Sequence, residues 1–156
     1  MRPYKHTQPG TLMRASFGAT IAFTLGLAAW TGRNEPQALL VFSLVTLLLG
    51  IGLALFHQLT VTVSKDFIRL RFGVGVVHKN FAIADVESAF VVRNKWWYGW
   101  GIRITPHGWL YNVSGYDAVE IVLKNGRYAR IGTDEPKRLL AAIEAALPTG
   151  SGSRSR

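Results

Sequence analysis

The sequence predicts a membrane α-helical hairpin joined to a mainly-β domain of about seven antiparallel strands, which ends in one helix. Three features of the 156 residues lead to this fold class: two long uncharged stretches, a run of short alternating segments after them, and one late helical period. The hydrophobic share of 49% excludes a disordered chain. The absence of cysteine excludes a disulfide framework, a thiolate zinc site and a cysteine nucleophile.

The two uncharged stretches predict two membrane spans. Residues 38–56 contain nineteen residues without a charge, about 28 Å of helix and close to the thickness of a bilayer's hydrocarbon core. Residues 15–31 are uncharged as well but richer in small residues. A signal peptide is the alternative for this first stretch, although Trp30 stands where a small cleavage residue is expected. We therefore predict a hairpin over residues 15–57, after a basic leader of residues 1–14.

The flanking charges predict an orientation for this hairpin. Lys and Arg are frequent before the first span and after the second, whereas Arg33 is the only such residue in the turn between them. Cytoplasmic flanks carry the excess of Lys and Arg in membrane proteins. Both termini are therefore expected to be cytoplasmic.

A stripe of small residues, Gly18, Ala22 and Gly26, recurs every four positions in the first span. Such a stripe allows close approach of helix backbones, and packing of this kind drives helix association in lipid. We expect the stripe to pack the two spans against each other, with a homodimer face as the alternative. Neither span contains an ionisable residue, which argues against a transporter.

Alternating apolar residues after the hairpin predict the β domain, over residues 58–147. The first predicted strand pair places one set of side chains on the buried face: Leu59, Val61, Val63, Ile68, Leu70 and Phe72. Asn125-Gly126 predicts a two-residue hairpin between later strands, with positive φ at both positions.

A single amphipathic helix is predicted to end the domain. Residues 133–136 (TDEP) resemble a helix start with a capping side chain and a proline, and Pro148 ends the helical period. The apolar positions at helical spacing are Leu139, Leu140, Ile143 and Leu147. Residues 148–156 are expected to form a flexible basic tail.

The order of short antiparallel strands followed by one helix is that of a pleckstrin-homology-like barrel. Three strings carry a closer resemblance: residues 98–103 (YGWGIR), 108–115 (GWLYNVSG) and 130–134 (RIGTD). Over residues 12–147 the chain resembles small bacterial membrane proteins that have two N-terminal spans and a pleckstrin-homology-like domain. This resemblance implies a location in the bacterial inner membrane and a binding or scaffolding role, and it supplies no catalytic residues.

Basic residues in the first predicted strand pair suggest a lipid-headgroup site. Lys65, Arg69 and Arg71 have the spacing at which pleckstrin domains gather cations around phosphates by charge-assisted hydrogen bonds. Strand alternation alone also explains polar residues at positions 69 and 71. We keep both interpretations, and we expect at least non-specific attraction to an anionic leaflet.

An aromatic segment is the second candidate site. Four of the five tryptophans lie between residues 94 and 112, in a stretch with glycine and proline. We expect Trp96, Trp97, Tyr98 and Trp100 to form a surface that contacts a protein partner or lipid, with core packing as the alternative. Trp109 is expected in the core, because it opens an alternating strand.

Enzymatic and nucleic-acid functions are not expected. The four histidines are scattered, no phosphate-binding loop occurs, and no cofactor or metal site is predicted. Although the whole chain carries a net charge of +9, residues 58–147 hold twelve Lys and Arg against eight Asp and Glu, which is no nucleic-acid stripe. We expect a membrane-anchored, non-enzymatic binding module of unpredicted oligomeric state. A membrane-bound enzyme or accessory subunit with a dispersed site is the alternative.

Overall fold

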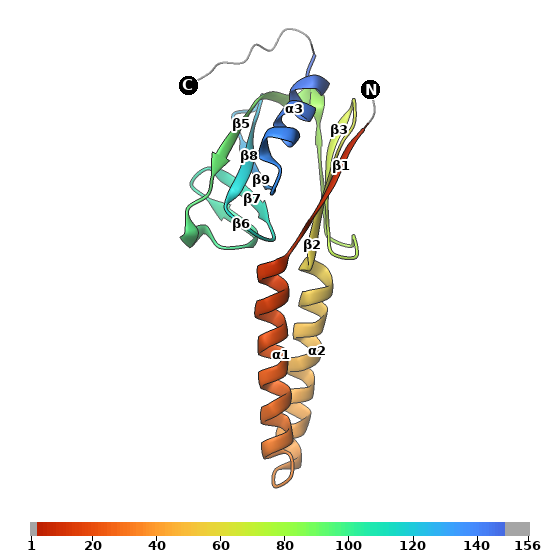
Figure 1. Cartoon of the computed structure of the whole chain (residues 1–156), viewed down its shortest axis with the longest axis vertical. Helices are drawn as coiled ribbons and strands as arrows, with labels where there is room; N and C mark the ends of the chain where they lie inside the picture. The colour runs from red at the N-terminus through yellow and green to blue at the C-terminus, as the bar shows by residue number, and fades with distance from the viewer. Residues whose placement is uncertain (1–2, 149–156) are drawn as a thin grey trace.

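Two long helices project from a β domain in the computed structural model, which describes residues 3–148 (Figure 1). Helix α1 spans Thr11–Thr31 and helix α2 spans Pro36–Phe56, and both are long and apolar enough to cross a membrane. Each contains 21 residues, so each is about 31 Å long. Both predicted spans are confirmed as helices. Of the predicted tail, residues 148–156, only residue 148 is among the described residues.

Backbone and side-chain contacts tie the start of α1 to the end of α2. The backbone N–H of Gly10 donates to the carbonyl oxygen of His57 at 2.9 Å, and Arg14 Nε donates to the same oxygen at 3.0 Å. At the other end, Pro36 occupies the first turn of α2, where its missing N–H costs nothing. The helices therefore enter the β domain side by side.

The contact between the helices runs along one face of α1. Thr24 and Ala28 are its buried residues, and the hydroxyl oxygens of Thr24 and Thr46 lie 3.1 Å apart. A Cβ placed on Gly52 would lie 2.8 Å from Cε1 of Phe17, so the Phe17 ring packs directly on this glycine. Close approach in this hairpin therefore depends on Gly52.

The predicted small-residue stripe does not form this contact. Gly18, Ala22 and Gly26 are all exposed, and a Cβ on Gly18 or Gly26 would meet no atom within 4 Å. The expectation that the stripe packs the two spans together is wrong. Gly18 follows Phe17 by one residue and is therefore rotated by about 100° away from the face that contacts α2.

The predicted leader is part of the β domain. Residues Tyr4–Pro9 form strand β1, which pairs antiparallel with β2 (Gln58–Val63) across the base of the hairpin. His6 extends from β1 to Asp134, with Nε2 and Oδ1 2.6 Å apart. Within the described residues 3–14, the leader predicted for residues 1–14 is thus divided between β1 and the first turn of α1.

The first sheet contains four strands in the order β1-β2-β3-β4, with β3 at Phe67–Phe72 and β4 at His78–Ala82. The predicted alternation on β2 and β3 is confirmed, because the six predicted apolar residues are buried. Arg69 and Arg71 point to the opposite face, as predicted. This sheet continues directly from α2.

The second sheet contains five strands in the order β5-β8-β9-β7-β6. Their bounds are Val86–Arg93 for β5, Gly101–Thr105 for β6, Gly108–Asn112 for β7, Asp117–Leu123 for β8 and Tyr128–Gly132 for β9. Short 3-10 turns η1 (Ile83–Asp85) and η2 (Trp96–Tyr98) flank β5. Strands β7 and β9 pair in parallel.

Two corrections to the predicted barrel follow from these sheets. Residues 3–148 form nine strands in two separate sheets instead of about seven strands in one barrel, and one pair is parallel instead of antiparallel. Strand β1 came from the leader, and strand β9 inserts between β8 and β7. The coarser prediction of a helical hairpin and a mainly-β domain with a C-terminal helix is confirmed.

Helix α3 (Pro136–Ala146) covers the space between the sheets and contacts β5, β8 and β2. Leu139 and Ile143 are fully buried, as their spacing predicted. The predicted capping hydrogen bond is absent: Glu135 is the N-cap residue and its side chain bonds no N–H of the first turn, while its own N–H donates to the Thr133 hydroxyl. Packing against the two sheets therefore stabilises this helix more than its cap does.

The turn between β8 and β9 differs from the predicted type. Gly126 has a φ of +77°, but no residue other than glycine has positive φ in the described part of the chain. The N–H of Leu123 donates to the carbonyl of Arg127, which encloses a three-residue loop. The Asn125 side chain accepts a hydrogen bond from the N–H of Arg127.

Candidate functional site

The outward face of the first sheet forms a groove of about 700 Å³ along β2. We call it the basic groove. Its polar lining consists of three cations, four hydroxyl side chains and one amide: Lys5, Arg69, Arg71, Thr7, Thr60, Thr62, Ser64 and Gln58. No Asp or Glu lines it.

Strand register arranges the cations in two rows. Arg71 lies opposite Thr60, and Thr60 lies opposite Thr7 on β1. In the next row Arg69 lies opposite Thr62, which faces Lys5 on β1. Sequence reasoning paired the two arginines correctly but missed Lys5. The inward positions of β1 are Tyr4, His6 and Gln8, which give no apolar alternation to identify a strand.

Lys65 does not belong to this arrangement. It lies in the turn between β2 and β3, at the end of the sheet far from the helices, beside Ala142 and Ala146 of α3. At about 3.3 Å per residue, Lys65 is about 23 Å farther along the strand direction than Gln58. The structure brings together Arg69 and Arg71 and separates Lys65 from them.

The groove cations have no acidic partners among residues 3–148. The ion pairs of this region involve His6, Arg130 and Arg138, and none involves Lys5, Arg69 or Arg71. The Arg71 guanidinium lies against Gly75, where an added Cβ would be 2.5 Å from Nη2. It is therefore directed toward the β3–β4 loop, at the helix end of the sheet.

The aromatic segment forms a chain of edge-to-face contacts around η2. Ring centroids of Trp96 and Trp97 are 5.8 Å apart, and those of Trp97 and Tyr98 are 6.2 Å apart. Trp96 is 71% exposed and Trp97 is 59% exposed. Lys95 Nζ lies 5.0 Å from the Trp97 ring centroid. Trp100 is less exposed, because its indole packs on Tyr116 and its Nε1 donates to the Gly115 carbonyl.

Trp109 is not a core residue. Its side chain is 47% exposed, while its neighbours Leu110 and Tyr111 are buried. Trp109 instead stacks on Tyr111, with centroids 6.5 Å apart. The alternation of β7 is broken at Leu110, Tyr111 and Asn112, which are all buried, in a strand that lies between β9 and β6 in the second sheet.

The strings that carried the family resemblance form a structural network. Asn112 Nδ2 donates to the Gly115 carbonyl, and Asn112 Oδ1 accepts from the N–H of Ser114. An added Cβ on Gly132 would collide with the Asn112 side chain. Gln8 of β1 donates to the Ser114 carbonyl at 3.0 Å. These residues therefore join the two sheets at the helix end of the domain.

Arg130, in the third string, forms an ion pair with Glu120 at 2.7 Å and a hydrogen bond to Asn94 at 3.3 Å. All three residues lie on or beside the second sheet, and both partners of the ion pair are largely buried. Because Asn94 immediately precedes the aromatic segment, this network fixes where that segment leaves β5. The network therefore positions the aromatic segment.

An aromatic cleft of about 410 Å³ lies between β4 and the second sheet. Phe81, Trp109, Tyr111 and Tyr128 line it, with Lys79 and Arg127 among the polar residues. Burial raises the pKa of the Tyr111 hydroxyl above its ordinary value, so this group stays protonated and neutral. The aromatic rings of the cleft suit an apolar or aromatic side chain, and Asp85 lies in the lining together with Lys79 and Arg127.

Comparisons with known proteins identify no relative. No family model, curated protein or solved structure matches this chain. Among residues 3–148, no three His, Asp or Glu side chains come together as a metal site would require. The basic groove, the aromatic segment and the aromatic cleft are the surfaces from which we argue a function.

Proposed function

We propose that this chain is a non-enzymatic module of the bacterial inner membrane, anchored by α1 and α2, whose pleckstrin-homology-like domain contacts anionic lipid headgroups through the basic groove. The observation that carries the proposal is the groove itself: three unpaired cations and four hydroxyls without a carboxylate, on a sheet that continues from α2. Charge-assisted hydrogen bonds from Arg and hydroxyl groups suit phosphate oxygens.

Height above the bilayer distinguishes the cations. If α2 ends at the hydrocarbon boundary, Arg71 stands about 7 Å above Gln58 and Arg69 about 13 Å above it. The headgroup layer is about 5–8 Å thick, and the attraction of an anionic leaflet decays over about 8–10 Å. Arg71 is therefore expected to contribute most, Arg69 and Lys5 less, and Lys65 almost nothing.

Membrane topology is the first test. The chain has no cysteine, so single cysteines at Asn34 and Asn125 can be labelled individually in intact cells. We expect a membrane-impermeant thiol reagent to label Asn34→Cys and not Asn125→Cys, because Lys and Arg concentrate on the side of the β domain. Labelling of the cysteine at 125 alone would reverse the orientation.

Titration with a soluble short-chain anionic phospholipid tests the groove. In the purified full chain we expect the lipid to raise the melting temperature and Arg69→Ala/Arg71→Ala to weaken its apparent affinity by about tenfold or more, at about 1 kcal/mol per cation. Lys65→Ala is the matched control and should change the affinity by less than about twofold. Equal losses in both variants, or equal binding of a zwitterionic lipid, would contradict headgroup binding in the groove.

A protein partner is a second candidate, supported by the aromatic cleft and by strand β4. Strand β4 pairs only with β3 in the described part of the chain, so its other edge is open to an added strand. An extended peptide on this edge would place alternate side chains in the cleft. Trp109→Ala should weaken such a complex and leave the lipid titration unchanged.

A further inference from the structure

Two loops of the β domain carry exposed apolar side chains at the end that faces the helices. In residues 3–148, the β domain has five large apolar residues that are more than half exposed: Val74, Val76, Trp96, Trp97 and Ile104. The first two lie in the β3–β4 loop and the next two in the aromatic segment. Four of the five therefore gather in two loops.

The β3–β4 loop lies beside the last turn of α2. The N–H of Val74 donates to the carbonyl of Ala54 at 3.2 Å, and Gly73 packs on the backbone of Ala54 and Leu55. Each helix is about 31 Å long, and the hydrocarbon core is about 30 Å thick, so neither helix has a turn to spare above the membrane. Val74 therefore lies at the hydrocarbon boundary.

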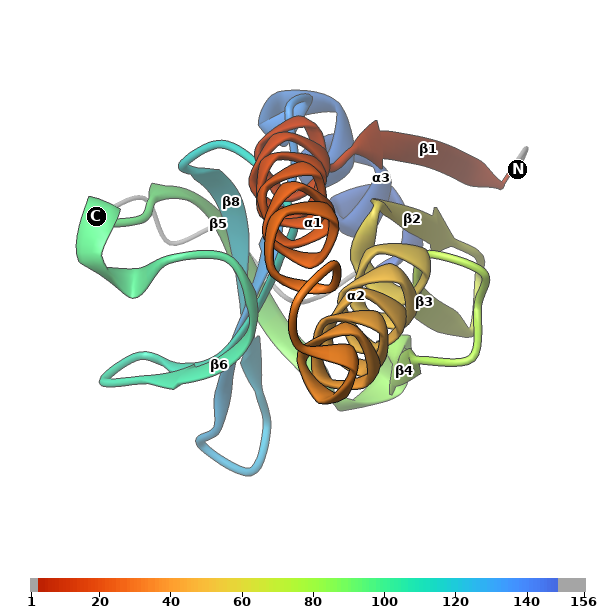
Figure 2. The same cartoon turned by 90° about the horizontal axis from the view of Figure 1, so that it is seen from below.

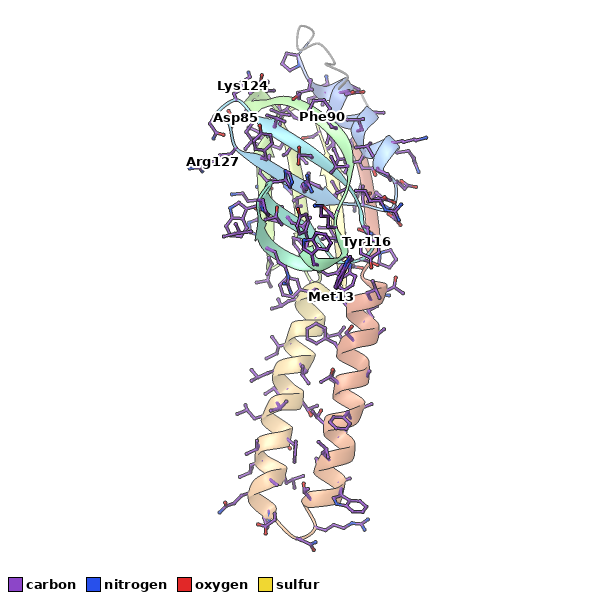
Figure 3. The ribbon with its side chains drawn as sticks, turned by 90° about the vertical axis from the view of Figure 1, so that its left-hand side faces the viewer. Met13, Asp85, Phe90, Tyr116, Lys124 and Arg127 are labelled. Atoms are coloured by element: carbon purple, nitrogen blue, oxygen red, sulfur yellow. The ribbon has the colours of Figure 1, made fainter. Side chains whose placement is uncertain are left out.

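The aromatic segment lies beside the first turn of α1. A Cβ added to Gly101 would lie 3.7 Å from Cε of Met13. Trp100 Nε1 donates a hydrogen bond to the carbonyl of Gly115, and Gln8, at the end of β1, donates one to the neighbouring carbonyl of Ser114. Figure 3 shows Met13 and Tyr116 next to each other where the domain meets α1. Seen from below, the β3–β4 loop and the turn between β5 and β6 lie on opposite sides of the helical pair (Figure 2).

The residue types of these loops suit a membrane interface. Trp and Tyr concentrate at the headgroup level, and Lys and Arg extend from there toward water. Lys95 covers the Trp97 ring, and the exposed Arg93 and Arg103 flank the segment. A surface built for water alone would not place two valines and two tryptophans at this height.

We infer that the β3–β4 loop and the aromatic segment insert shallowly into the lipid interface on either side of the helical pair and hold the β domain against the bilayer. This inference rests on the proposed membrane anchoring of α1 and α2. Three contacts, one hairpin and two loops, fix the orientation of the domain, and they keep the helix end of the basic groove at the headgroups.

Spin-label accessibility tests the inference on the full chain in lipid bilayers. Single cysteines replace Val74, Val76, Trp96 or Trp97, with Asn125→Cys as the control at the far end of the domain, where Figure 3 places Lys124 and Arg127. We expect the four loop labels to be several-fold more accessible to oxygen, relative to a water-soluble nickel chelate, than the label at 125. Oxygen partitions into the bilayer, whereas the chelate does not.

A label at Leu47→Cys, in the middle of α2, separates the two possible failures. If the label at 47 is in lipid but the loop labels match the label at 125, the loops are in water and the inference is wrong while the anchoring stands. If the label at 47 also matches the label at 125, the anchoring itself is wrong.

Tryptophan quenching by brominated lipids gives an independent measurement that needs no label. In a Trp30→Phe background, Trp96→Ser/Trp97→Ser should remove most of the quenchable fluorescence, and Trp109→Phe should remove little. Ile104→Ser is the matched control for removal of an exposed apolar side chain. Unchanged quenching in the Trp96/Trp97 double variant would overturn the inference.

Discussion

The interior of the β domain and the contact between α1 and α2 differ in how far apolar residues are buried. In the β domain, apolar residues of β2, β3 and α3 are buried at the positions where their sequence period places them. Between the helices, only Thr24 and Ala28 of α1 are buried and no residue of α2 is, although both helices are apolar throughout. An apolar residue is therefore a sign of a buried position in the β domain, but it does not identify the contact face between α1 and α2.

The physical reason lies in the solvent. Water drives apolar side chains together, so an apolar period in the β domain marks the buried face. Lipid tails are as apolar as leucine, so in a bilayer only close packing and hydrogen bonds distinguish the contact face. The Phe17–Gly52 contact and the Thr24–Thr46 pair supply both.

The largest expected effect comes from the β-domain core. Phe72 is fully buried, and its ring centroid lies 5.8 Å from that of Phe56 and 6.4 Å from that of Tyr111. Phe72 therefore joins α2 to both sheets. We expect Phe72→Ala to lower the free energy of unfolding by about 3–5 kcal/mol. Phe67→Ala on the same strand is the control, because Phe67 is exposed, and it should cost less than about 1 kcal/mol. Equal losses would mean that burial on β3 does not determine stability.

In the hairpin the same comparison uses glycines. Gly52→Leu should force the Phe17 ring away and destabilise the helical pair by about 1–3 kcal/mol, measured by denaturation of the full chain in detergent. Gly18→Leu should leave the monomer unchanged, because no atom lies near that position. If Gly18→Leu instead dissociates a cross-linked dimer, the exposed stripe is a face between two copies.

A smaller effect is expected from Trp109. Because the ring is half exposed and its main contact is the stack on Tyr111, Trp109→Ala should cost about 1–2 kcal/mol, well below a buried aromatic. Thermal unfolding of the full chain measures the difference. A loss as large as that of Phe72→Ala would show that Trp109 belongs to the core after all.

The smallest effect belongs to the hydroxyl pair within the hairpin. Thr24→Val keeps the shape and removes the hydrogen bond to Thr46, and interhelical hydrogen bonds in lipid are worth about 0.6 kcal/mol on average. A mutant cycle of Thr24→Val, Thr46→Val and the double variant measures this energy, as the loss in the double variant minus the losses in the two single variants. A coupling energy above about 2 kcal/mol would mean that the polar pair, and not the glycine contact, determines helix association.

Some residues of the basic groove could be predicted from the sequence, and others only from the fold. Arg69 and Arg71 share a face because alternate residues of any strand do, so the sequence could predict that pair. Lys65 looked like a neighbour because it is close in the chain, yet a strand runs in a straight line and carries it to the opposite end of the sheet. Lys5 completes the groove from a segment more than fifty residues away in the sequence, which no local pattern connects to β2.

By itself the sequence determined the two helices, the buried faces of β2 and β3, and the C-terminal helix. These features follow from bilayer thickness and from periods of two and 3.6 residues, which act within a few neighbouring positions. Only the tertiary structure decided that β1 joins the first sheet, that β9 enters between β8 and β7, and that α1 turns its small residues away from α2. Those outcomes depend on which distant segment offers backbone hydrogen bonds or a close fit, and this information is spread over the whole chain.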